Sequence, residues 1–228
     1  MKYLLVILLI FFTSVNIGIA AVQCLNVGRS SCAEIFQYGD PIGARYRTLT
    51  ILDDTKVVRV LRGEVDNGGV FEQTEVPVLS PDGNFALINQ IESGEVEASS
   101  GSITHHEVAY CDLLDVRSGC IIAKETGEFC GGTFSSDGKW NNQLYPEFNL
   151  AAETPKAKNY VGGLQQFSDS PASSFDNLLF CDPPNINNVS DYRILIERNN
   201  FNLKSLDSSI LKKMNKNKVL INILRNSS

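Results

Sequence analysis

Short runs of β-branched and aromatic residues alternate with turn residues in the middle of the chain. They occupy residues 45–52, 56–65, 70–79, 85–92, 106–116 and 120–125. Threonine, valine, isoleucine, tyrosine and phenylalanine suit the pleated, half-buried surface of a sheet, while asparagine, aspartate and glycine supply the backbone angles that hairpin turns need. The pattern predicts a mostly β protein built from antiparallel sheets.

The strand pattern fades beyond Trp140. Residues 141–190 are rich in asparagine, proline, serine and aspartate, a composition that favours long loops with a few strands. Further on, Asn202 or Ser205 is suited to cap a short C-terminal helix. The helix could dock on a partner or pack on the body, and an altered carboxy-terminus from a frameshifted gene is a third explanation of the tail.

Two segments share one turn pattern, an apolar residue followed by Ser-x-Asp-Gly and an aromatic strand. They are LSPDGNFA at 79–86 and FSSDGKWN at 134–141, and YCDLLDVRSGCI lies between them at 110–121. Residues 76–142 thereby resemble the blades of TolB-like and WD-type β-propellers, which implies small, propeller-like sheets. Because Ser-x-Asp-Gly is good turn chemistry in any hairpin, an antiparallel sandwich accounts for the same segments.

The first twenty residues have the pattern of a signal peptide. Lys2 precedes an apolar run from Tyr3 to Phe12, and the small residues Gly18 and Ala20 fit cleavage after Ala20. We therefore expect residues 1–20 to be removed, leaving a β domain at 21–190 and a basic tail at 191–228. Export to the periplasm or the medium follows, and no later segment predicts stable membrane insertion.

All six cysteines lie in the part of the chain that the cleavage would leave. An even number of cysteines in an exported chain predicts disulfides. Six cysteines allow fifteen pairings, and proximity favours only one of them, between Cys24 and Cys32. The candidates for bridges are Cys24, Cys32, Cys111, Cys120, Cys130 and Cys181.

Charge is distributed unevenly along the chain. Residues 21–190 carry 23 acidic and 11 basic side chains, a net of −12, whereas residues 191–228 carry 3 and 8, a net of +5. An acidic body disfavours nucleic acid as a partner and is compatible with a cationic protein. Solubility alone explains the same excess of acids.

No catalytic or metal-binding pattern stands out. His105 and Glu107 would lie on one face of a strand and could supply two metal ligands, with His106 on the other face, but a hydrolytic zinc site needs a third ligand. Asp112 and Asp115 are available as the third ligand, but their spacing from His105 and Glu107 matches no known metal-binding pattern. The nucleophile elbow of serine hydrolases is absent from the sequence. We expect no cofactor, because glycine-rich phosphate loops are absent as well.

Two functions fit these observations. The first is an exported, non-catalytic binding protein. In size, charge and export it resembles the periplasmic inhibitor or immunity proteins of bacteria, which block a toxin or hydrolase. The second is an exported hydrolase with a dispersed active site, built on the histidines or on a carboxylate pair such as Asp112 and Asp115.

Overall fold

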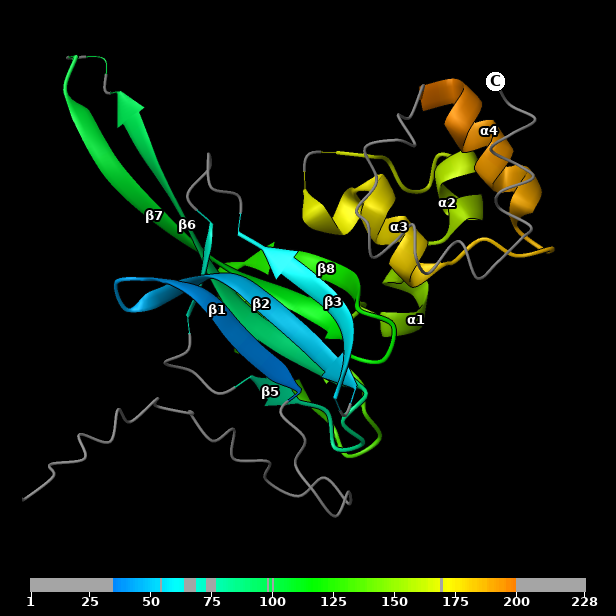
Figure 1. Cartoon of the computed structure of the whole chain (residues 1–228), viewed down its shortest axis with the longest axis horizontal. Coiled ribbons are helices and arrows are strands. Elements are labelled where there is room, and N and C mark those ends of the chain that lie inside the picture. The colour runs from blue at the N-terminus through cyan, green and yellow to red at the C-terminus, as the bar shows by residue number, and fades with distance from the viewer. Residues whose placement is uncertain are drawn as a thin grey trace, which may run out of the picture.

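The computed structural model describes residues 35–199, apart from residues 54, 64–68, 73–76, 98, 100 and 169. The predicted signal peptide, the Cys24–Cys32 pair and the predicted helix beyond Asn202 lie outside these residues. Figure 1 shows an antiparallel sheet flanked on one side by a group of short helices.

Strands make up most of the regular structure, so the mostly β, antiparallel fold is confirmed. The large sheet contains β1 (Phe36–Ile42), β2 (Arg45–Asp53), β3 (Lys56–Arg62), β4 (Val70–Glu72), β5 (Val78–Leu79), β6 (Phe85–Glu97), β7 (Ile103–Asp115) and β8 (Cys120–Thr126). A small hairpin pairs β9 (Thr133–Phe134) with β10 (Trp140–Asn141). β1 precedes the first run that the sequence pattern marks, and β6 and β7 extend beyond their predicted ends.

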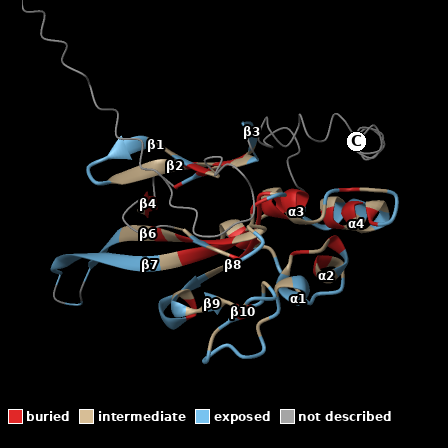
Figure 2. Ribbon diagram, turned by 90° about the horizontal axis from the view of Figure 1, so that it is seen from below, coloured by how far each residue is buried: buried red, intermediate tan, exposed pale blue. Residues whose placement is uncertain are grey.

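The large sheet bends back on itself without closing. Its strand order is β1-β2-β4-β6-β7-β8, with β3 paired to β2 and β5 paired to β6. Figure 2 shows β1, β2 and β3 facing β6, β7 and β8 across the core. The inner core between them contains Phe36, Leu49, Ile51, Leu61, Phe71, Ala86, Ile88, Leu114, Val116, Ile121 and Ala172. We call the side of β6, β7 and β8 that meets this core their inner face.

The opposite, outer face of β6, β7 and β8 is covered by irregular chain. A 3₁₀ helix, η1 (Gly127–Gly131), and the β9–β10 hairpin bring Phe129 and Trp140 onto Leu113. A disulfide between Cys111 and Cys130 ties η1 to β7. The outer face is therefore buried as well, which explains the long apolar run in β7 and β8.

Both predicted Ser-x-Asp-Gly turns form. The Gly83 N–H donates to the Ser80 C=O at 2.8 Å, and the Gly138 N–H donates to the Ser135 C=O at 2.9 Å. In each turn the serine hydroxyl also donates to the carboxylate of the aspartate. Gly83 has a φ of +67°, in the left-handed region that glycine adopts without strain.

The prediction of long loops with a few strands at 141–190 was wrong. This region and its continuation form α1 (Leu150–Glu153), α2 (Ala157–Val161), η2 (Pro171–Ser173), α3 (Phe175–Cys181) and α4 (Val189–Asn199). Asn149 and Ser174 cap the starts of α1 and α3 by accepting backbone N–H groups. The polar residues that led to the prediction of loops cap the helices instead. These helices are too short for their apolar residues to show a clear helical period.

The helices have a core of their own. It contains Ala157, Tyr160, Phe175, Leu178, Leu179, Phe180, Tyr192 and Leu195. Because Tyr192 and Leu195 are buried in it, the first residues of the segment at 191–228 pack with the body as part of α4.

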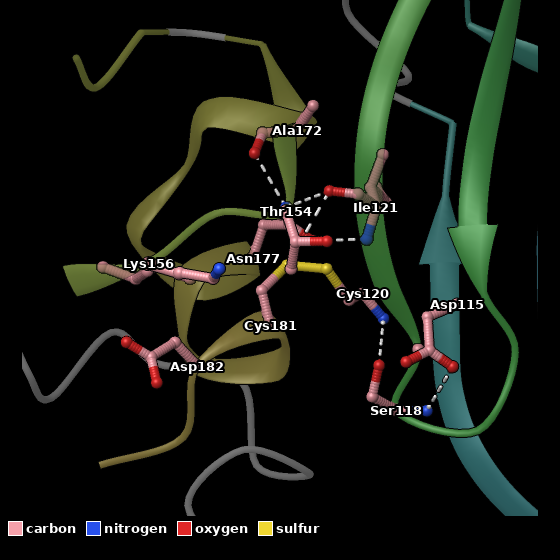
Figure 3. The surroundings of a disulfide bond; sticks show 12 residues. Asp115, Ser118, Cys120, Ile121, Thr154, Lys156, Ala172, Asn177, Cys181 and Asp182 are labelled. Carbon is pink, nitrogen blue, oxygen red and sulfur yellow. Dashed lines mark hydrogen bonds between the residues drawn. A yellow bond between two sulfur atoms is a disulfide. The ribbon is translucent and has the colours of Figure 1, made fainter. Parts of the chain in front are cut away.

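Hydrogen bonds connect the edge of β8 to α3 (Figure 3). The side-chain amide of Asn177 accepts the Ile121 N–H at 2.9 Å and donates to the Ile121 C=O at 2.7 Å. Arg59 of β3 donates to the same Asn177 oxygen at 2.6 Å. Beside this contact, the disulfide between Cys120 and Cys181 joins the start of β8 to the end of α3.

Candidate functional site

A cleft of about 590 Å³ runs along the free edge of β8. Four consecutive residues, Ile122 to Glu125, line it. Side chains of consecutive strand residues point to opposite faces, so the feature that these four residues share is the strand edge. β8 ends the strand order of the described sheet, and no strand pairs with it on this side. The cleft volume lies within the range of ligand-binding pockets.

Helical and irregular segments form the other walls of the cleft. The segment at 144–148 supplies Tyr145, Glu147 and Phe148, and the end of α1 supplies Glu153. The wall that faces β8 also contains Tyr160 of α2, Gln165, Gln166, Ser170, Ala172 and Ser173. The lining combines aromatic rings with amide and carboxylate groups, a composition suited to holding a polar group against an apolar surface.

The charge in the cleft is negative and uncompensated. Burial raises the pKa of Glu125, and the charge of Glu153 raises it further. Among the described residues, no lysine or arginine forms an ion pair with Glu125, Glu147 or Glu153. A cation placed between these carboxylates would relieve their repulsion.

Lys124 also lines the cleft, but its ammonium group is already paired. It donates to the Glu92 carboxylate and lies 4.8 Å from the centre of the Tyr110 ring. This side chain therefore does little to neutralise the acids of the cleft, since its charge is turned to the inner face of the sheet.

Asp112, one of the candidate ligands, is buried on the inner face beside Lys124, its cross-strand neighbour. Among the described residues, its Oδ1 atom has no hydrogen-bond partner. Burial raises the pKa of Asp112 to about 6, although the charges of Lys124 and Arg59 oppose the shift. Because the folded state binds this proton more tightly than the unfolded chain does, Asp112 favours folding at low pH.

We expect Asp112→Asn to flatten the dependence of stability on pH. In the wild type, the stabilisation by the Asp112 proton is complete below about pH 4 and is lost as the pH rises through about 6. The difference in free energy of unfolding between wild type and variant should therefore shift by up to about 3 kcal/mol between pH 4 and pH 7. Urea unfolding at the two pH values measures it. Glu97→Gln, at an exposed carboxylate, is the control, and equal pH profiles for wild type and Asp112→Asn would contradict the assignment.

The histidines lie away from the cleft, on an arm that β6 and β7 form beyond the rest of the sheet (residues 93–97 and 103–108; Figure 1). His106 contacts the Thr104 hydroxyl at 3.0 Å. His105 and Glu107 share a face of β7, as the alternation predicts, but both carboxylate oxygens of Glu107 accept from Arg45, which holds the pKa of Glu107 below its usual range. Within the described residues, no three histidine, cysteine or acidic side chains are arranged to hold a metal ion.

Asp112 and Asp115 do not form a carboxylate pair. Asp115 lies in the turn between β7 and β8, where its carboxylate accepts the backbone N–H groups of Arg117 and Ser118. Asp112 is buried within the sheet. The four described cysteines are all bridged, which confirms the expectation of disulfides and settles two pairings that the sequence left open.

The residues of the cleft were not candidates in the sequence. Glu125 ends a predicted strand, and Glu147 and Glu153 lie in the segment expected to be loop. They come together only because η1 and the β9–β10 hairpin carry the chain over the outer face and back to the edge of β8. The acidic charge of the body was the one signal that pointed towards them.

Comparison of the chain with family models, with curated proteins and with solved structures finds no match. No helix in the described part of the chain is both long and apolar enough to cross a bilayer.

Proposed function

We propose that this chain is an exported, non-catalytic binding protein, and that the cleft beside β8 receives a cationic group of a partner protein. The observation that carries the proposal is the set of three carboxylates, Glu125, Glu147 and Glu153, which line one cleft without a basic side chain paired to them in the described residues. An arginine or lysine of a partner would supply the missing charge.

Export is part of the proposal. The signal-peptide pattern at 1–20 predicts it, and the two disulfides are compatible with an oxidising compartment. The net charge of −12 on residues 21–190 would steer a cationic partner towards the molecule over a Debye length of about 10 Å. A periplasmic inhibitor or immunity protein that blocks a basic toxin or hydrolase is the subclass that fits this combination.

A hydrolase remains the second candidate, in its carboxylate form. The observation that favours it is the effect of burial and of Glu153 on Glu125, whose raised pKa is a property of general acids. The histidine form has less support, because His105 and His106 lie on the exposed arm rather than in the cleft.

The charge of the cleft can be tested with short peptides. The probe is the acetylated and amidated pentapeptide TVRVT, and its match is TVEVT, in which glutamate replaces the central arginine. We expect TVRVT to bind and to shift the amide resonances of residues 122–125, 144, 145, 147 and 148, and TVEVT to leave them unchanged. Glu125→Gln with Glu153→Gln should weaken TVRVT binding about tenfold, as removal of two partly exposed ion pairs implies.

The control variant is Glu95→Gln, at an exposed carboxylate on the arm, which should bind TVRVT as the wild type does. Equal binding of the two peptides, or no effect of the double variant, would overturn the proposal. Turnover of chromogenic glycosides that is lost in Glu125→Gln would overturn it in favour of the hydrolase.

A further inference from the structure

The backbone of β8 presents a free hydrogen-bonding position to the cleft. Residues of an antiparallel pair alternate between those that hydrogen bond to the neighbouring strand and those whose N–H and C=O point away from it. Leu114 and Asp112 are two residues apart on β7, so their partners on β8, Ile121 and Lys124, belong to the same class. A β-bulge between them accounts for the odd spacing on β8.

The contacts of Asn177 show in which direction the N–H and C=O groups of Ile121 and Lys124 point. The Ile121 N–H and C=O both bond to the Asn177 side chain, on the side of β8 away from β7. The N–H and C=O of Lys124 therefore point the same way, and Lys124 lines the cleft. In the described part of the chain, no loop backbone or side chain hydrogen bonds to these two groups.

The protein itself shows how this edge is satisfied. At Ile121 a carboxamide, which has the same donor and acceptor as a peptide unit, bonds to both backbone groups of the edge (Figure 3). At Lys124 the same pair of groups faces the open cleft. An unpaired strand edge is the surface on which an extended segment of another chain adds as a further strand.

We propose that an extended segment of a partner protein pairs with β8 at Lys124, and that a basic side chain of this segment lies between Glu125 and Glu153. This inference rests on the proposed function and names the conformation of the partner at the same cleft. The occupant is expected to be cationic, because the cleft carries three acids and, among the described residues, the one basic side chain in its lining is that of Lys124, which is paired with Glu92. The backbone hydrogen bonds would give the segment its register, and the carboxylates would select its charge.

The backbone pairing is tested with a second peptide and a pair of variants. The peptide is TVRVT with an N-methyl group on the nitrogen of the second valine, which keeps the positive charge and removes one backbone donor. In an antiparallel pair with the arginine opposite Glu125, this valine lies opposite Lys124 and its N–H faces the Lys124 C=O. The variants are Lys124→Pro and Lys124→Ala. Both lose the contacts of the lysine side chain with Glu92 and Tyr110, but only proline also lacks the outward N–H, and an edge strand tolerates proline at such a position.

We expect TVRVT to bind Lys124→Pro about tenfold more weakly than Lys124→Ala, because a carbonyl oxygen of the peptide loses the N–H of residue 124 as its donor. The N-methylated peptide should bind the wild type about tenfold more weakly than TVRVT. If Lys124→Pro does not fold, the N-methylated peptide alone decides. Binding that ignores N-methylation but is weakened by Glu125→Gln with Glu153→Gln would overturn the strand pairing and leave the proposed function standing.

Hydrogen exchange of the Lys124 amide, measured in the full exported chain, distinguishes a partner segment from other occupants of the β8 edge. We expect fast exchange in the free protein and slow exchange with TVRVT, whereas the Ile121 amide, bonded to Asn177, should exchange slowly in both. Slow exchange of Lys124 without peptide would overturn the proposal. Its cause would be the chain's own segment at 200–228 if protection is independent of protein concentration, and a second copy if protection rises with concentration.

Discussion

Replacing Asn177 by alanine should lower the free energy of unfolding by about 4 kcal/mol, because it leaves several buried polar groups without partners. The Asn177 amide accepts from Arg59 and from the Ile121 N–H, and it donates to the carbonyl oxygens of Ile121 and Ala172. Asn177 is completely buried, so water cannot replace these bonds in the folded state. Urea unfolding measures the loss.

A structural readout separates this effect from simple loss of packing. The Ile121 amide should exchange with solvent faster in Asn177→Ala than in the wild type, because its acceptor is gone. Asn187→Ala, at an exposed asparagine near α4, is the matched control and should change stability by less than about 0.5 kcal/mol. A loss below about 1 kcal/mol in Asn177→Ala would show that α3 does not hold the edge of β8 through this amide.

Removing the disulfide between Cys120 and Cys181, as Cys120→Ala with Cys181→Ala, should cost about 4 kcal/mol, or about 10 °C in Tm. The two cysteines are 61 residues apart in sequence, so the bridge removes a large loop entropy from the unfolded chain. It also joins β8 to the helices, which otherwise meet the sheet through η2, α1 and the Asn177 contact. Thermal unfolding by circular dichroism measures the shift.

The second disulfide provides the comparison. Cys111 and Cys130 are 19 residues apart, and their removal should cost about 3 kcal/mol by the same loop argument. After full reduction, the wild type and both double variants should unfold at similar temperatures, since each then lacks both constraints. A larger loss for the Cys111–Cys130 pair would contradict the ranking by loop length.

Local chemistry in the sequence was sufficient for much of the sheet. The runs at 45–52 and 120–125 became β2 and β8 almost unchanged, because β-branched residues and hairpin turns act over a few residues. The Ser-x-Asp-Gly turns formed for the same reason, through bonds within four residues. An even cysteine count predicted bridges, although it could not pair them.

The helices are less visible in the sequence. α1 and α2 have four and five residues, too few to show a helical period, and their caps Asn149 and Lys156 stand in a segment with loop composition. Their stability comes from packing rather than from intrinsic propensity, as the burial of Ala157 and Tyr160 in the helical core indicates. Composition therefore predicted loops where tertiary contacts produce helices.

By itself, the sequence determined the mostly β class, the positions of the long central strands, the turns and an acidic body, all of which depend on neighbouring residues or on totals. Only the tertiary structure decided the disulfide pairing, the separation of His105 from the cleft, and the meeting of Glu125 with Glu153. The physical reason is that these outcomes depend on how a bent sheet and its covering helices bury apolar surface. That burial brings together residues far apart in the chain and leaves the edge of β8 open beside them.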